Sequence, residues 1–417
     1  MRILKLTPQT EASMIKRREG RDRGAFRVAA RIVTDVKQHG DTALNEWTQK
    51  LDSLDVRGKR LWVTPEEIGA AKKRVDRRFL RAVEHAAANV RLVAEKQLPR
   101  EWSLEVEPGV KVAQLIRPIE SIGCYIPGGR FALFSTMVMT VVPAQVAGVQ
   151  RIAVVCPRAN DELLATADLL GVTHLARIGG AQAIAAFAYG TKRIEPVEKI
   201  FGPGNRYVTA AKQIVSYDCA IDLPAGPTEA IVLARDGNPR WIAADLLAQA
   251  EHAPDAGSYL VTTSARLASQ VQQEVAAQLE CLPRTNPARI SSERTGAILL
   301  AHTWENCIAF VNRFAPEHLS LPESSPALLK KIRSSGTIFV GHLSAQPFGD
   351  YASGSNHVLP TGGWARRRGG LSAGEFVKQI SVQSINSSGY RRLAHDVQIM
   401  ANAEGLLAHA NAVEVRK

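Results

Sequence analysis

Cysteine is scarce in this 417-residue sequence, which has five scattered cysteines and no Cys-x-x-Cys pair. An odd number of widely spaced cysteines argues against a disulfide framework, so we expect them to be reduced and mostly buried in a cytoplasmic protein. No apolar run approaches the ~18 residues of a membrane span. The first residues, MRILKLTPQT, lack the apolar stretch of a signal peptide. We therefore expect no membrane association.

Acidic residues are outnumbered, with Asp+Glu 40 against Lys+Arg 52 and a formal net charge of +12. This balance suits an enzyme that handles anionic cofactors, and it also permits a nucleic-acid surface. The basic clusters at 16–18 and 366–368 are typical of solvated surface, and no RNA- or DNA-binding signature accompanies them. We expect no nucleic-acid partner, and the alternative of a basic nucleic-acid-binding protein is tested by the salt dependence of duplex binding.

The hydrophobic fraction is 45%, as in ordinary globular proteins. The first hundred residues favour helices, with a capping box at Thr64-Pro65-Glu66-Glu67. Beyond about Gln114, short apolar runs alternate with Ala-rich helical segments, and the alternation resumes after Pro224. The predicted strands are 151–156, 174–178, 199–201, 230–234, 258–262 and 298–300. This rhythm predicts an α/β protein with two Rossmann-like, doubly wound domains, parallel sheets, and small helical N- and C-terminal segments.

The expected domain boundaries follow from these segments. We assign 1–20 to an N-terminal helical extension, and 21–122 with 235–371 to a larger, discontinuous α/β domain. Residues 123–234 form the second Rossmann-like domain, with Ala225–Pro227 as a crossing point. Residues 372–417 are expected to be a helical tail.

Two short motifs carry residues suited to metal binding and proton transfer. Gln249 and His252 stand three residues apart near the end of a predicted helix, so they share one helical face and can share a metal. Glu317 and His318 are adjacent, so they point in different directions and can act as general bases on different sides of a substrate. Each motif alone also fits an ordinary polar surface.

The most unusual segment is Gly349–Thr361, GDYASGSNHVLPT, which lies in a stretch rich in Gly, Ser, Asn and Pro. A polar loop of this kind can arrange Asp350, Asn356 and His357 around a small polar substrate. Near the C-terminus, Glu404 and His409 lie in a segment that is otherwise an unexceptional helix end.

Two glycine turns each follow a predicted strand, the Gln182 turn GGAQ and the Asn205 turn FGPGN, and the Tyr125 turn CYIPGG is a third. Turns at this place in α/β folds bind nucleotide phosphates through backbone N–H groups and the helix dipole. None is a G-x-G-x-x-G fingerprint. Each also fits a simple tight turn.

Taken together, in order and spacing, these motifs resemble the histidinol dehydrogenase family over nearly the whole chain. The resemblance implies one zinc ion per subunit, and NAD as the cosubstrate. The implied zinc ligands are Gln249, His252, Asp350 and His409. The implied NAD contacts, all in the second domain, are Tyr125, Gln182 and Asn205. The implied contacts to the substrate L-histidinol are Thr228, Gln249, His252, His318, Asp350, His357, Glu404 and His409.

The family reaction oxidises L-histidinol to L-histidine through a bound aldehyde, with two NAD⁺ reduced, as the last step of histidine biosynthesis. In that reaction His318 would take the alcohol proton, and Glu317 would activate the water that hydrates the aldehyde. Family members are homodimers with an intertwined C-terminal segment. The resemblance therefore implies that Glu404 and His409 serve the partner subunit's site.

Two departures keep an alternative open. Position 228 is Thr where many members have Ser, which retains the hydroxyl but adds a methyl group. A Thr here is similar to a related branch acting on sulfonated diols, so a paralogous zinc- and NAD-dependent dehydrogenase for another polar diol or amino alcohol is the alternative. The Pro316–Leu319 sequence PEHL favours the histidinol branch. The run Arg130–Phe134 is bulkier than is usual after the glycine turn.

Overall fold

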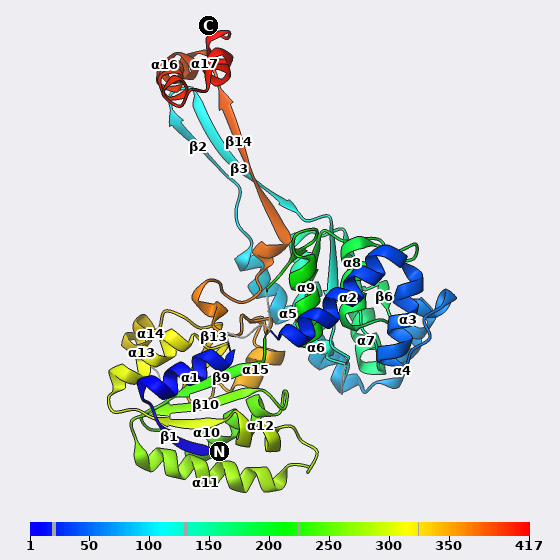
Figure 1. Cartoon of the computed structure of the whole chain (residues 1–417), viewed down its shortest axis with the longest axis vertical. Coiled ribbons are helices and arrows are strands. Elements are labelled where there is room, and N and C mark those ends of the chain that lie inside the picture. Colours follow the sequence, from blue (N-terminus) through cyan, green and yellow to red (C-terminus); the bar gives the residue numbers. More distant parts are fainter. Residues whose placement is uncertain (19–21, 129–131, 224–225, 324) are drawn as a thin grey trace.

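The computed structural model contains two α/β domains and a long arm that projects from them (Figure 1). It describes residues 1–18, 22–128, 132–223, 226–323 and 325–417. The bulky residues Arg130 and Phe131, and the first part of the expected crossing point at Ala225, lie outside the described residues. None of the described helices combines the length and apolar character that crossing a bilayer takes.

One domain is built on a six-stranded parallel sheet with the strand order β1-β11-β10-β9-β12-β13. Its strands are β1 (Arg2–Lys5), β9 (Glu229–Leu233), β10 (Gly257–Thr262), β11 (Ala297–Leu300), β12 (His318–Leu321) and β13 (Thr337–Val340). Its helices are α1 (Pro8–Arg18), α10 (Pro239–Ala250), α11 (Ala265–Cys281), α12 (Ala288–Arg294), α13 (Trp304–Phe314) and α14 (Pro326–Lys331).

Alternation along β9 explains why helices cover both faces of this sheet. Ile231 and Leu233 belong to one apolar core with Phe310 of α13, whereas Val232 belongs to a second core with Leu246 of α10. Successive residues of a strand point to opposite faces, so an unbroken apolar strand requires cover on both.

The other domain has a five-stranded parallel sheet with the order β6-β5-β4-β7-β8. Its strands are β4 (Ser121–Tyr125), β5 (Arg151–Val155), β6 (His174–Ala176), β7 (Lys199–Phe201) and β8 (Ala220–Ile221). Its helical elements are α2 (Arg23–His39), α3 (Asp41–Asp52), η1 (Gly58–Leu61), α4 (Pro65–Arg74), α5 (Arg77–Gln97), α6 (Phe134–Ala147), α7 (Asp161–Leu169), α8 (Gly180–Tyr189) and α9 (Arg206–Val215). Both sheets therefore confirm the predicted doubly wound, parallel α/β class.

The grouping of segments differs from the expected boundaries. Residues 23–97 pack mainly on the five-stranded sheet, because α2 contacts α8 and α9, α4 contacts α7, and α5 contacts α6. Residues 2–5 are a strand of the six-stranded sheet, paired with β11, so the N-terminal segment is more than a helical extension. The apolar faces of α2 and α5 are what join them to the sheet, since their buried residues belong to its two cores.

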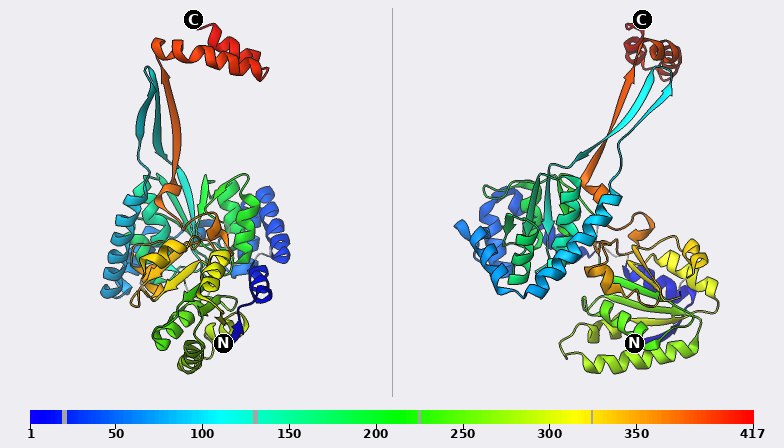
Figure 2. Two further views of the ribbon diagram at one scale, coloured as in Figure 1. Left: turned by 90° about the vertical axis from the view of Figure 1, so that its left-hand side faces the viewer. Right: turned by 180° about the vertical axis from the view of Figure 1, so that it is seen from behind.

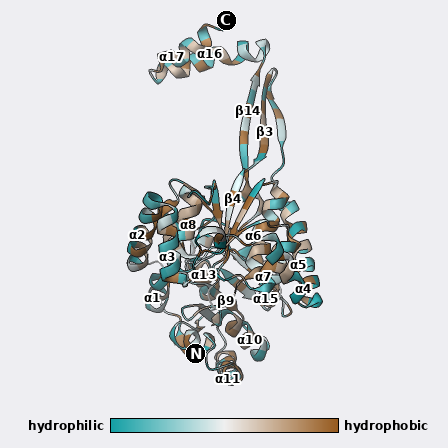
Figure 3. Ribbon diagram, turned by 90° about the vertical axis from the view of Figure 1, so that its right-hand side faces the viewer, coloured by the Kyte–Doolittle hydropathy of each residue, from teal (hydrophilic) through white to brown (hydrophobic). Residues whose placement is uncertain are grey.

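The arm is a three-stranded antiparallel sheet of order β14-β3-β2, with α16 (Ser387–Ala403) and α17 (Leu407–Glu414) at its tip (Figure 2). Its strands are β2 (Trp102–Glu107), β3 (Val110–Pro118) and β14 (Val377–Ile385). The prediction that 372–417 is a helical tail was therefore wrong for its first part, which contains β14. The antiparallel pairing of β14 with β3 runs over nine residues, which the local sequence did not reveal. Hydrophobic residues recur along β3 and β14 (Figure 3).

Candidate active site

The candidate catalytic residues lie where two central strands of the six-stranded sheet begin. His318 is the first residue of β12, and it pairs in register with Ala230 of the neighbouring strand β9. Glu317 and Thr228 immediately precede these strands. Strand order reverses between β9 and β12, and ligands of open α/β sheets usually bind at such a point, outside the carboxyl ends. Here the candidate residues occupy the amino edge instead.

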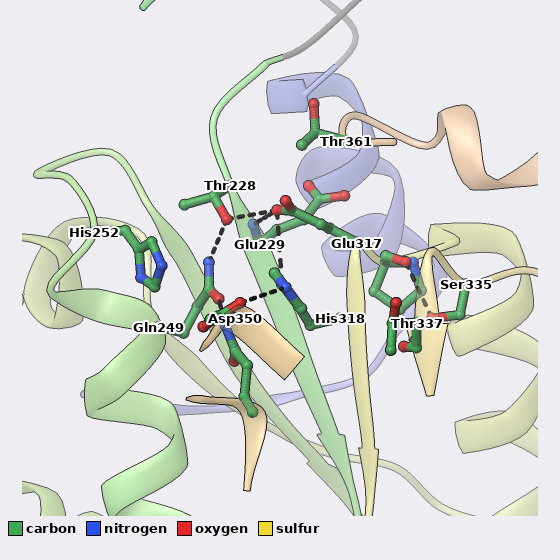
Figure 4. Close-up of polar contacts among 12 residues, drawn as sticks. Thr228, Glu229, Gln249, His252, Glu317, His318, Ser335, Thr337, Asp350 and Thr361 are labelled. Atoms are coloured by element: carbon green, nitrogen blue, oxygen red, sulfur yellow. Dashed lines mark hydrogen bonds and ion pairs between the residues drawn. The ribbon is translucent and has the colours of Figure 1, made fainter. Parts of the chain in front are cut away.

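The Glu317 carboxylate is buried and held in one orientation. Its Oε2 accepts a hydrogen bond from the Thr228 hydroxyl at 2.5 Å and another from the backbone N–H of Glu229 at 2.9 Å (Figure 4). Both donors come from the start of β9, next to β12 in the sheet. Two donors on one oxygen fix the carboxylate as a preorganised acceptor.

His318 is buried, and neither of its ring nitrogens has a hydrogen-bond partner within the described chain. Nδ1 lies 3.8 Å from Glu317 Oε2, and Nε2 lies 3.7 Å from Asp350 Oδ1, which is too long for a hydrogen bond. Burial lowers the pKa of His318, but the two nearby carboxylates outweigh it, so the pKa is raised above its usual value. An imidazole with unengaged nitrogens can accept a proton from a bound molecule.

Gln249, His252 and Asp350 gather beside His318 (Figure 4). Gln249 lies in the last turn of α10, which ends at Ala250, and His252 follows just beyond the helix. Asp350 was expected in a loop but lies on the short helix α15 (Gln346–Tyr351). Burial raises the pKa of Asp350. The neighbouring His318 and His252 together lower it by more, so the net shift of the pKa is downward.

This donor set suits a divalent cation. His252 Nδ1 lies 3.0 Å from the Ala248 carbonyl oxygen, a contact that places the proton on Nδ1 and leaves Nε2 as the ligand atom. An amide oxygen, a carboxylate and an imidazole are ligands that zinc and similar ions accept. No group of three His, Cys, Asp or Glu side chains in the described chain is placed to hold an ion. An ion bound here by His252 and Asp350 would need further donors to complete its coordination, and the amide oxygen of Gln249 is one that lies beside them.

His357 connects this site to the other domain. Its Nδ1 lies 2.8 Å from the Asp350 carbonyl oxygen, and its Nε2 lies 3.1 Å from the hydroxyl of Thr136, near the start of α6. Burial lowers the pKa of His357, which favours the neutral ring with one donor and one acceptor. The segment carrying Asp350 is thereby held against the carboxyl edge of the five-stranded sheet, because α6 follows β4.

The residues expected to contact NAD lie at that carboxyl edge. Tyr125 ends β4, and its hydroxyl accepts a hydrogen bond from the Gly180 N–H at the start of α8. Asn205 caps α9, accepting from the N–H groups of Tyr207 and Val208. Gln182 is buried and donates to Asp52. These side chains shape two helix N-termini beside the point where strand order reverses between β4 and β7.

A glycine is required at this reversal. Gly202 follows β7 with a φ of +111°, and a Cβ there would overlap the Tyr125 carbonyl oxygen. Only glycine combines this φ with such a close approach. The FGPGN turn is therefore a close backbone crossing between β4 and β7.

Glu404 and His409 are not brought to the site by their own chain. They lie at the tip of the arm, far from the two domains (Figure 1). Both are exposed. Every other predicted site residue lies either in the cluster at the amino edge of β9 and β12 or at the carboxyl edge of β4 and β7.

Sequence reasoning missed two buried contributors. Arg18 of α1 forms a bidentate ion pair with Glu229, stacks on Phe314 and donates to the Phe314 carbonyl. Gln346 donates a hydrogen bond to the Gln249 side-chain oxygen. Burial raises the pKa of Glu229 to about 7, against the opposing effect of Arg18. The cluster at 16–18 was interpreted as solvated surface, and nothing local marks Arg18 as the least exposed of these three basic residues.

The chain combines two doubly wound α/β domains with a buried carboxylate beside a buried imidazole. Helix N-termini of the kind that bind nucleotides lie at the carboxyl edge of one sheet. This combination is typical of a nucleotide-dependent oxidoreductase. The family model for histidinol dehydrogenase matches residues 15–417. Histidinol dehydrogenases of Methanothermobacter thermautotrophicus and Geobacillus kaustophilus are each 45% identical, over 93% and 92% of this chain and 92% of each relative. The crystal structure of histidinol dehydrogenase from Elizabethkingia anophelis has a TM-score of 0.94 at 39% identity, and covers 100% of this chain and 98% of that one. The chain belongs to the histidinol dehydrogenase family.

Proposed function

We propose that the protein is an NAD-dependent histidinol dehydrogenase of the cytoplasm that oxidises L-histidinol to L-histidine through a bound aldehyde, reducing two NAD⁺. The observation that carries this proposal is the pair of buried bases. Glu317 is held by two donors, and neither ring nitrogen of His318 is hydrogen-bonded within the described chain. Two oxidations at one carbon need two differently placed proton acceptors, and this pair supplies them.

In the first oxidation His318 accepts the proton of the alcohol as a hydride leaves the same carbon for NAD⁺. The carboxylates of Glu317 and Asp350 stabilise the imidazolium that forms. In the second oxidation Glu317 takes a proton from the water that adds to the aldehyde. His318 again accepts a proton as the hydrate loses its hydride to a second NAD⁺. Retaining the aldehyde in the site would prevent its loss between the two steps.

NAD⁺ would lie over the carboxyl edge of the five-stranded sheet, against the N-termini of α8 and α9. Tyr125, Gln182 and Asn205 support this placement because they hold those helix starts in position. Oriented backbone N–H groups and the helix dipole favour the pyrophosphate. The His357 contacts bring this edge and the bases to one interface.

Zn²⁺ would be held by Gln249, His252 and Asp350, with His409 of the partner subunit as the fourth ligand. When bound, the ion would hold the substrate's imidazole and amine in place. Thr228, His357 and Glu404 of the partner subunit would complete the substrate contacts. The chain's own residues orient the two bases. His357 holds the segment carrying Asp350 against the other domain.

The position of the arm supports a homodimer. The arm carries a chain's own tail away from its own site (Figure 2), and a second chain would supply the remaining ligand. The arm and tip also leave large apolar side chains exposed: Trp102, Leu104, Val106, Ile380, Val382, Ile385, Ile399, Met400 and Leu407. Contiguous exposed apolar surface of this kind marks a protein interface. Exchange of the arms between two chains would cover it.

The test is a turnover assay with L-histidinol and NAD⁺ that counts NADH per histidine formed. A ratio of two is expected. A ratio of one with aldehyde released would show that the role given to Glu317 is wrong. Absence of turnover with L-histidinol, together with NADH formation from a sulfonated diol, would favour the paralogous dehydrogenase.

A further inference from the structure

Four polar side chains form a directed chain of hydrogen bonds across the site. Gln346 Nε2 donates to Gln249 Oε1 at 2.6 Å, and Gln249 Nε2 donates to Thr228 Oγ1 at 2.8 Å. The Thr228 hydroxyl in turn donates to Glu317 Oε2 at 2.5 Å. Gln346 is 1% exposed and Gln249 is fully buried, so water does not replace these partners.

The carboxylate end fixes the direction of this relay of hydrogen bonds. A carboxylate only accepts hydrogen bonds, so the single hydroxyl proton of Thr228 is committed to Glu317. The Thr228 oxygen must then accept from Gln249, and the Gln249 amide must turn its NH₂ group toward Thr228. This turns the Gln249 oxygen toward Gln346, whose NH₂ group donates to it and stabilises that orientation of the amide.

We propose that Gln346 is a positioning residue that fixes the Gln249 amide and, through Thr228, couples the metal-ligand side of the site to the general base Glu317. This inference rests on the proposed function. Gln346 touches neither base, and its side chain reaches the site through Gln249. The oxygen it fixes is the atom that Gln249 would offer to a cation, and its second lone pair stays available.

Loss of the Gln346 donor frees the Gln249 amide to rotate by half a turn. The Gln249 oxygen would then face Thr228, whose proton would move from Glu317 to that oxygen. Two losses follow from one rotation: the cation would meet an NH₂ group in place of an oxygen, and Glu317 would lose one of its two donors. Removal of such a supporting partner typically lowers metal affinity or activity about 10–100-fold.

The experiment measures zinc affinity by competition with a chromogenic chelator, using the full-length protein without substrate. The variants are Gln346→Leu, Thr228→Val, Thr228→Ser and the Gln346→Leu/Thr228→Val double variant. Gln145→Leu is the control, because Gln145 of α6 also donates from its Nε2, at 2.6 Å to the carbonyl of Leu170 at the end of α7, away from the site. Single-turnover NADH traces then separate the alcohol step from the aldehyde step.

We expect Gln346→Leu to weaken zinc binding about 10–100-fold and to slow the aldehyde step more than the alcohol step. Gln145→Leu should change neither quantity, and Thr228→Ser, which keeps the hydroxyl, should retain the zinc affinity that Thr228→Val loses. In the double variant the losses should fall well short of the product of the single losses, because both substitutions break one relay. Equal zinc affinity and equal step ratio in Gln346→Leu and Gln145→Leu would overturn the proposal.

Two further outcomes remain informative. If Gln346→Leu does not fold, as judged by its thermal unfolding against the control, Thr228→Val against Thr228→Ser tests the same relay from its other end. Unchanged zinc affinity and step ratio in Thr228→Val would then refute the coupling. Failure of the wild-type protein to oxidise L-histidinol would overturn the proposed function, whereas the zinc measurement would still decide the relay.

Discussion

Glu317 and His318 are neighbours in sequence but have separate environments. Glu317 faces the start of β9 and accepts two hydrogen bonds there. His318 begins β12, and its ring lies between two carboxylates without hydrogen-bonding to either. The two side chains lie side by side, but only Glu317 has hydrogen-bond donors on its functional group, which gives one segment two bases with different surroundings.

This separation predicts different effects of removing each base. Glu317→Gln should leave the first hydride transfer largely intact with L-histidinol, yet block conversion of the aldehyde to histidine. His318→Asn should impair both steps, and loss of a general base typically costs about 10²–10⁴-fold in rate. Single-turnover NADH traces distinguish the two patterns. Equal damage to both steps by Glu317→Gln would contradict the division of roles.

Asp245 of α10, like Glu229, is a carboxyl group whose burial disfavours the charged form. It lines a small cavity with Asn238, Trp241, Ser320 and His342, and burial raises its pKa to about 6. An acid whose pKa is higher in the folded than in the unfolded protein stabilises the fold at low pH and loses that contribution as pH rises through the folded value.

We therefore expect Asp245→Asn to gain stability relative to wild type as pH rises from about 4 to about 6, by up to about 3 kcal/mol at about 1.4 kcal/mol per pKa unit. Thermal unfolding of both proteins at pH 4.5 and pH 7.5 measures the difference. A pH-independent difference would show that the carboxyl titrates normally.

At the scale of elements, α1 is fastened to the six-stranded sheet by two arginine pairs of different character. The Arg18 side chain is largely buried against Glu229 of β9. Glu11 of α1 pairs with Arg313 of α13, and the Arg313 side chain is 56% exposed. A buried pair is costly to break because the remaining charge has no partner, whereas an exposed pair contributes little.

Arg18→Met should therefore destabilise the protein by about 3–5 kcal/mol, and Arg313→Met by at most about 1 kcal/mol. The loss of stability caused by Arg18→Met should grow as pH rises through neutrality. The pKa of Glu229 is raised, so without Arg18 its carboxyl is neutral at lower pH and becomes a buried charge without a partner only at higher pH. Denaturant unfolding of both variants at pH 6 and pH 8 checks both statements. Equal costs for the two variants would contradict them.

The ends of α10 and α15 meet at the candidate metal site, which leads to a prediction on metal retention. Chelation should abolish activity, and Zn²⁺ should restore it. His252→Ala and Asp350→Ala should weaken zinc retention far more than His302→Ala, since His302 lies in an exposed turn away from α10 and α15. Metal analysis after dialysis measures retention. Full activity in metal-stripped protein would refute a role for the ion.

For the whole molecule, the sequence predicted the two parallel sheets well because alternation of strand and helix is a local pattern. The arm was missed because its central strand β3 pairs with β14 across 259 to 275 residues, which no local pattern reveals, although Trp102, Leu104 and Val106 alternate along β2 as in a strand. Domain boundaries failed for a related reason, since only tertiary packing shows which sheet α2 and α5 cover.

The site residues were likewise predicted where a local motif marks them and missed where none does. Glu317, His318, Gln249 and Asp350 stand in motifs that the sequence displays, and the structure brings them together. Arg18 and Gln346 have no motif, because their importance lies in partners more than 90 residues away along the chain.

The arm leads to the last prediction, that active sites are shared between two chains. Glu404 and His409 lie at its tip, and β2, β3 and β14 separate them from their own chain's Asp350 (Figure 1). A mixture of inactive His409→Ala and His252→Ala variants should therefore recover activity after subunit exchange. In a mixed dimer one site has both histidines intact and the other has lost both. Random pairing of equal amounts makes about half of the dimers mixed, so recovery should approach about a quarter of the wild-type rate. No recovery after verified exchange would mean that His409 serves no neighbouring site.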